Sequence, residues 1–157
     1  MRIQKITRKD KSFITVVYGE ERNKVTVSST EPCHVSFRNA LFDLVMPFVM
    51  ASRLAVIPDI QDEYEIKEVG FAYKDEFATE PDYITAVGEN NVGTQIKVHI
   101  ENADDVKKVI ENLIMEARLF VNGRRAQTEF PFNSIVVLPE EKLNEVDDLK
   151  KGLKNAN

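Results

Sequence analysis

The chain has 157 residues, of which 43% are hydrophobic and 30% charged, and its net charge at pH 7 is −5. This composition is typical of one globular domain and excludes a disordered chain, while the negative charge argues against a protein that coats duplex DNA. No apolar run reaches the roughly 18 residues of a membrane span, and the N-terminus lacks the apolar stretch of a signal peptide, so we expect a cytoplasmic protein without membrane contact.

The first 29 residues alternate between apolar and polar side chains with the period of β-strands. The apolar runs lie at Ile3 and Ile6, at Phe13–Tyr18, and at Val25 and Val27. Charged segments at 8–11 and 19–24 separate the runs and are expected to be turns. This part of the chain is therefore predicted to be a meander of three antiparallel strands.

A helical period follows the strand-like segment. Apolar residues recur at steps of three and four and predict a helix from about Val35 to Arg53. Pro47 lies inside this helix, lacks an amide hydrogen and crowds the carbonyl of Asp43. We therefore expect a kink or a break at Pro47.

The second half of the chain returns to strand-like and then helical patterns. Its three apolar runs lie at Tyr64–Tyr73, Tyr83–Val87 and Thr94–Ile100. The segments 74–82 and 88–93 between them are rich in turn residues. Asn102 is expected to be the N-cap of a helix from about Ala103 to Val121, and Gly123 is expected to end this helix.

The two halves resemble each other in order and in detail. Phe13–Val17 matches Tyr83–Val87, and each segment is followed by a glycine and a glutamate, at Gly19 and Gly88. The α+β fold predicted from this match is a tandem β-β-β-α repeat, with antiparallel meanders and two helices packed on the sheet. Any two meanders followed by helices would look somewhat alike, so a fold without duplication stays open.

The repeats are expected at about 1–53 and 63–123, within a single α+β domain of residues 1–138. Residues 139–157 are expected to form a charged C-terminal tail.

Catalytic patterns are absent from the sequence, which predicts a protein that is not an enzyme and needs no cofactor. Cys33 is the only cysteine, and no intrachain disulfide can form. His34 and His99 are the two histidines. With Cys33 they offer three metal ligands, but none has a familiar short spacing. A metal-dependent enzyme is therefore the remote alternative, and we expect no metal site.

The N-terminal hairpin is basic and offers an alternative function. Its cations are Arg2, Lys5, Arg8, Lys9 and Lys11. With Phe13 and Tyr18 as stacking surfaces, they predict a binding site for single-stranded nucleic acid. The other interpretation is that lysines along a solvated strand edge prevent aggregation.

The predicted first helix is apolar nearly all round. Beyond its core-facing stripe it carries Phe42, Met46 and Met50. These side chains are expected either to lie between the sheet and the second helix or to form a symmetric interface with a second copy of the chain.

The segment after Gly123 combines a basic start with spaced apolar residues. Its candidate partner-binding residues are Arg124, Arg125, Gln127, Phe130 and Phe132. Gln127, Phe130 and Phe132 have the spacing of the six-residue motif by which replication proteins bind the bacterial sliding clamp, with Phe130 in place of the usual leucine or methionine. The alternative is a strand that folds back on the domain's own core.

A family resemblance rests on the run from Glu116 to Gln127, on the opening Arg2-Ile3 and on the strand Ile84-Thr85-Ala86. These segments resemble small uncharacterised proteins of bacteriophages that infect Gram-positive hosts, commonly encoded among replication and recombination genes. The tail beyond Phe132 is longer than in that family. The resemblance implies a protein of the bacterial host cytoplasm and brings no catalytic residue with it.

Taken together, these patterns predict a non-enzymatic, protein-binding accessory protein of phage DNA replication or recombination. We expect it to assemble with itself and with a replication protein such as a sliding clamp.

Overall fold

The computed structural model describes residues 1–54 and 57–126. Its elements all lie in one compact unit, Met1–Arg124; a second unit, Arg125–Asn157, contributes only residues 125 and 126 to the described part. The elements in chain order are β1 (Ile3–Asp10), β2 (Phe13–Glu20), β3 (Asn23–Ser28), α1 (Val35–Asp43), α2 (Val45–Ala51), the 3₁₀ helix η1 (Ile60–Asp62), β4 (Tyr64–Ala72), β5 (Tyr83–Asn90), β6 (Gln95–Glu101) and α3 (Lys107–Val121).

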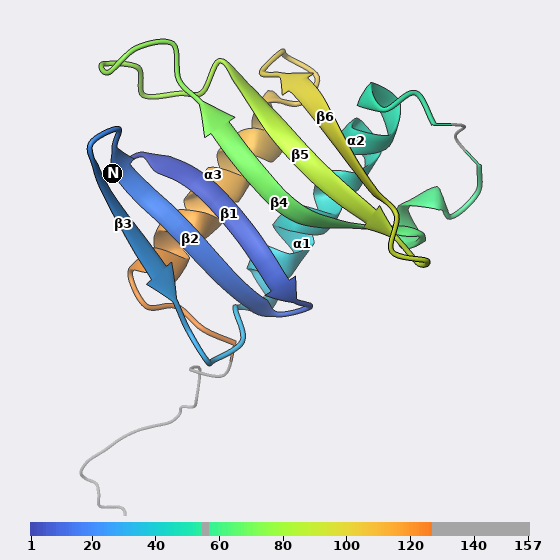
Figure 1. Ribbon diagram of the computed structural model, residues 1–157, viewed down its shortest axis with the longest axis horizontal. Coiled ribbons are helices and arrows are strands. Elements are labelled where there is room, and N and C mark those ends of the chain that lie inside the picture. Colours follow the sequence, from blue (N-terminus) through green and yellow to red (C-terminus); the bar gives the residue numbers. More distant parts are fainter. Residues whose placement is uncertain (55–56, 127–157) are drawn as a thin grey trace, which may run out of the picture. The chain divides into compact units, whose positions relative to one another are not determined.

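The strands form one six-stranded antiparallel sheet in the order β3-β2-β1-β4-β5-β6. The helices α1, α2 and α3 lie on one face of it, and no helix of the described residues covers the other face (Figure 1). The predicted α+β class with antiparallel strands and helices packed on the sheet is confirmed. We call the uncovered surface the open face.

The centre of the sheet is a short pairing between β1 and β4. Only Lys5–Thr7 of β1 pair with Glu68–Gly70 of β4, whereas the other neighbouring strands pair over most of their lengths. Beyond Thr7 the two strands diverge, and α1 passes behind the gap between them (Figure 1). The sheet therefore consists of two three-stranded halves joined by a short seam.

One continuous core lies between the sheet and the helices. Strand residues that alternate towards the helices are fully buried, among them Ile6, Val16 and Val69. The helices add aromatic contacts: the rings of Phe37 in α1 and Phe120 in α3 meet edge to face, with centroids 5.8 Å apart. This packing fixes α1 and α3 against each other and beneath the sheet.

The predicted first helix is interrupted, at a different residue from the one expected. The break lies at Leu44, whose amide donates to the carbonyl oxygen of Leu41 at 3.1 Å. Pro47 is the third residue of α2, in the first turn, where its missing amide hydrogen costs no intrahelical bond. The bond that Pro47 cannot make is the one to the carbonyl of Asp43, which would have continued α1 into α2, so the effect of the proline falls at the end of α1.

The second predicted helix begins four residues later than expected. Asn102 does not cap it: its side-chain amide donates to the carbonyl oxygen of Pro81 at 2.8 Å, and the N-cap position is Val106. The predicted end is correct. Gly123 has a φ of 109°, and the amides of Gly123 and Arg124 donate to the carbonyls of Phe120 and Leu119, which is a Schellman ending.

Strands β2 and β5 continue through the two glycines that were expected to start turns. Gly19 has a φ of 117°, and a Cβ there would overlap the carbonyl of Asn23. Gly88 instead lies beneath the ring of the buried Phe48, where a Cβ would come within 2.6 Å of Cε2. The two glycines are needed for different reasons, one for its backbone conformation and the other for the absence of a side chain.

Candidate functional site: a braced loop with an exposed phenylalanine

The loop between β4 and β5, residues 73–82, presents the most exposed aromatic side chain among the described residues. Phe77 is 82% exposed. Its amide donates to Oδ1 of Asp75 at 2.9 Å, and the amide of Ala78 donates to the carbonyl of Asp75 at 3.3 Å. The phenylalanine therefore lies at the tip of a hydrogen-bonded turn.

The guanidinium of Arg2 holds this turn in place through two hydrogen bonds. Nη1 of Arg2 donates to the carbonyl oxygens of Asp75 and Ala78, at 2.9 and 2.8 Å, on either side of Phe77. The Arg2 side chain is only 12% exposed and lies 4.4 Å from the ring centre of Tyr73. Because the donor is nearly buried and held by a ring, its bonds fix the turn to the body of the domain.

Tyr73 ties the start of the loop to β1. Its hydroxyl donates to the carbonyl oxygen of Ile3 at 2.7 Å. Burial raises the pKa of the Tyr73 phenol above its usual value, although the positive charges of Arg118 and Arg2 act in the opposite direction. The direction of this pKa shift favours the protonated phenol, the form that donates the hydrogen bond to Ile3.

The charges around Phe77 are mainly acidic. The loop contains Asp75, Glu76, Glu80 and Asp82 against Lys74 alone. Glu80 is engaged by Lys107 of α3, with 3.4 Å between carboxylate oxygen and ammonium nitrogen. Asp75 and Glu76 directly precede Phe77 in the chain, whereas Asp82 lies at the base of the loop, where its amide donates to the carbonyl oxygen of Ala72 at 2.7 Å.

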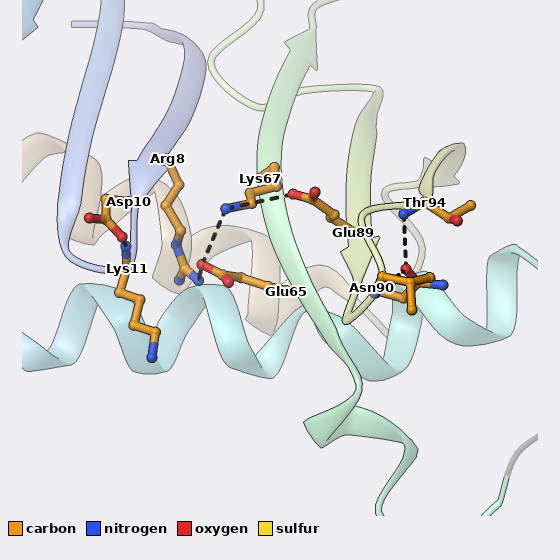
Figure 2. A network of polar contacts seen from close by, with 9 residues as sticks. Arg8, Asp10, Lys11, Glu65, Lys67, Glu89, Asn90 and Thr94 are labelled. Atoms are coloured by element: carbon orange, nitrogen blue, oxygen red, sulfur yellow. Dashed lines mark hydrogen bonds and ion pairs between the residues drawn. The ribbon is translucent and has the colours of Figure 1, made fainter.

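A polar cleft of about 680 Å³ opens where β1 and β4 diverge, with α1 along one side. Figure 2 shows its central charges: Arg8 reaches Glu65 at 2.7 Å, and Lys67 lies 3.8 Å from Glu65 and 3.7 Å from Glu89. The Arg8 side chain is only 10% exposed. The alternating charges neutralise one another and link the two halves of the sheet across the gap.

The five basic residues predicted to bind nucleic acid do not form one patch. Arg2 braces the β4–β5 loop, Arg8 lies in the cleft, and Lys5 lies on the open face, 3.5 Å from Glu68. Lys9 and Lys11 are exposed near the β1–β2 turn.

The two aromatic residues predicted to be stacking surfaces are also separated. Phe13 is 37% exposed, whereas Tyr18 packs against the core. The site expected from the N-terminal hairpin is therefore not assembled as a unit.

Two of the three residues predicted to lie in an oligomer interface are on the surface of this chain. Phe42 is 46% exposed and Met50 is 67% exposed, while Met46 packs against the core. Phe42 and Met50 are therefore not enclosed between the sheet and α3.

The histidines of the metal alternative have separate local roles. Nδ1 of His34 accepts a hydrogen bond from the amide of Ser36 at 3.1 Å and so caps α1. His99 lies on β6, stacked on Tyr83 and bonded to Glu101. Cys33 is buried. Within residues 1–54 and 57–126, no three His, Cys, Asp or Glu side chains are placed to hold a metal ion.

The segment predicted to bind a partner is described only at its start. Arg124 bonds to the buried carboxylate of Glu116, and Arg125 is 9% exposed. Gln127, Phe130 and Phe132 lie outside the described residues.

Sequence reasoning missed Phe77, because segment 74–82 was interpreted only as a turn. The available signal was an aromatic residue within an acidic, turn-forming run.

No protein-family model matches the chain, and neither the curated proteins nor the solved structures that were searched gave a match. Across the described residues, no helix is both long and apolar enough to cross a membrane.

Proposed function

We propose that this chain is a binding protein rather than an enzyme, and that it docks onto another protein through Phe77. The observation that carries the proposal is the combination of an 82% exposed ring with a turn held by the nearly buried Arg2. An exposed aromatic on a loose loop would be ordinary. On a turn braced at both sides, it is ready to enter a pocket without further ordering.

The energetics favour such an anchor. Burying a phenylalanine side chain contributes about 1.5–3 kcal/mol, and aromatic residues are enriched among the residues that dominate binding energy. Because the turn is already fixed, little loop entropy is lost on binding. The carboxylates of Asp75 and Glu76 beside the ring favour a partner whose apolar pocket is rimmed by lysine or arginine.

Site-specific photocrosslinking tests this proposal. We would place p-benzoylphenylalanine at position 77 and, as a matched control, at Val92, an 83% exposed apolar residue on the β5–β6 turn. We expect a protein adduct from position 77 only, with the crosslinked peptide in a basic, apolar segment of the partner. Glu76→Lys should abolish it. Equal adducts from both positions, or an adduct that survives Glu76→Lys, would refute the proposal.

We also propose that the two halves of the sheet arose by duplication, as a tandem β-β-β-α repeat. The symmetric strand order, with β1 and β4 antiparallel at the centre, supports this origin. The matched segments Phe13–Val17 and Tyr83–Val87 occupy the middle strand of each half. The interrupted α1–α2 pair and the continuous α3 would then be diverged copies.

Self-association is a second proposal, supported by the exposure of Phe42 and Met50.

The phage origin and the role in replication or recombination also remain proposals, supported by the sequence resemblance alone. Recovery of a sliding clamp by the full chain, and its loss in Gln127→Ala/Phe130→Ala, would test the clamp motif. Equal recovery of the clamp by the unaltered chain and by the variant would contradict the proposed role of this motif.

A further inference from the structure

The open face of the sheet contains a shallow trough along β4. Two small residues, Gly70 and Ala72, lie among the larger side chains of neighbouring strands. The resulting hollow of about 310 Å³ is lined on the β1–β3 side by Lys5, Val17 and Lys24 and on the β5 side by Tyr83 and Thr85. We call this hollow the β4 trough.

Gly70 itself is not explained by the fold. It sits mid-strand, paired with Lys5 on one side and Thr85 on the other, and its φ is not in the left-handed region. A Cβ at this position would meet no atom within 4 Å. A glycine inside a strand is unfavourable and often marks a bulge, a tight bend or a place where a ligand or another backbone approaches closely. The pairing of β4 with β5 is regular at Gly70, since its register shift lies between Ile66 and Glu68.

The walls of the trough suit a flat, negatively charged ligand. The ring of Tyr83 stacks on that of His99 with centroids 4.1 Å apart and 27° between the planes, so the tyrosine is supported from the side of β6. Lys24 is exposed, and Lys5 is about half exposed with its ammonium 3.5 Å from Glu68. An aromatic wall thus faces two cations across the small residues of β4.

We propose that the β4 trough binds single-stranded nucleic acid, with a base over Gly70 beside Tyr83 and the backbone phosphates near Lys5 and Lys24. Binding without sequence preference uses this combination of aromatic stacking and cations along a groove. The site is separate from Phe77 and does not depend on the protein-docking proposal.

Fluorescence anisotropy with labelled oligothymidylate at low salt tests the proposal. We expect the full chain to bind, with an affinity that falls steeply as salt is added. Gly70→Val places a side chain in the trough and should weaken binding by at least about tenfold. Lys24→Glu should weaken binding and flatten the salt dependence. Lys108→Ala, an exposed cation on α3, should change neither.

Folding controls keep the two variants interpretable. Valine suits a strand and meets open space at position 70, so Gly70→Val should keep the far-UV circular dichroism spectrum and melting temperature of the parent. Lys24 lies on the edge strand β3, where a substitution should be tolerated even if Gly70→Val fails. No anisotropy change with the unaltered chain, or unchanged binding by Lys24→Glu or a folded Gly70→Val, would overturn the proposal.

Discussion

Substitution of Gly88 by alanine should destabilise the domain, because the ring of Phe48 occupies the space above this glycine. A Cβ at position 88 would lie 2.6 Å from Cε2 and 2.8 Å from Cε1 of Phe48. The ring cannot simply rotate away: Phe48 is fully buried and its centroid is 5.7 Å from that of Tyr64. Either α2 shifts or the rings repack.

The size of the effect follows from two opposed terms. Overpacking a core by one methyl group costs about 1–3 kcal/mol, while replacing a strand glycine by alanine returns about 0.5–1 kcal/mol. The net loss should be up to about 2.5 kcal/mol, or a melting temperature lower by up to roughly 10 °C for a domain of this size. Gly70→Ala is the matched control, because its Cβ meets no atom within 4 Å.

Urea unfolding of both variants, followed by circular dichroism, measures the difference. Gly70→Ala should be as stable as the parent or more so. Adding Phe48→Leu to Gly88→Ala should cost less than the sum of the two single effects, because the smaller side chain makes room for the methyl group. A Gly88→Ala variant as stable as Gly70→Ala would show that the contact with Phe48 does not restrict this position.

Three further predictions concern the loop, the cleft and the helix surface. Because burial raises the pKa of Tyr73, the contribution of this side chain to the stability of the domain should be complete below pH 10 and decline as the pH rises towards the raised pKa. Tyr73→Phe should flatten this alkaline loss of stability in thermal melts. At neutral pH it should cost about 1 kcal/mol, because the hydrogen bond to Ile3 is lost. A double-mutant cycle of Arg8→Met and Glu65→Gln should give a coupling of about 1 kcal/mol in urea unfolding, and additivity would contradict the link across the cleft. If the chain self-associates through its first helices, Phe42→Ser and Met50→Ser should each lower the mass measured by light scattering after size exclusion, whereas unchanged masses would place the interface elsewhere.

Local sequence patterns were sufficient to predict the class of the fold and the six strands. Period-two alternation located every strand to within a few residues, because one face of the sheet is buried and the other is not. The pairing of β1 with β4 was not predictable in the same way. It joins residues far apart in the chain, and no turn sets its register.

The errors at helix ends have tertiary causes. Asn102 has the side chain of an N-cap, but its side-chain amide donates to the carbonyl oxygen of Pro81 in the β4–β5 loop instead. Pro47 was correctly expected to disturb the first helix, yet the break falls at Leu44 because proline acts on the preceding turn. Capping preferences describe isolated helices, and a nearby loop can offer the same side chain another partner.

The candidate site was less accessible to sequence reasoning than the fold. The role of Arg2 depends on a loop more than seventy positions away, which no local pattern connects to it. In contrast, the separation of the basic side chains of the N-terminal hairpin could have been predicted from their positions in the sequence. Lys5 and Arg8 are three residues apart on one strand, and a period of two sends such side chains to opposite faces. Counting the charges of this segment did not show that its basic side chains lie on opposite faces of the strand.

The short seam between β1 and β4 also bears on how the domain folds. Within each half, neighbouring strands follow one another along the chain, so their pairing has low contact order. Among the strand pairings of the sheet, only the seam requires the closure of a long loop. The conformational entropy of that loop must be lost before any seam contact forms. We therefore expect refolding to slow when Ile6 or Val69 is truncated and to respond little to changes in the β2–β3 turn. Seam amides should then exchange with deuterium only when the whole unit unfolds.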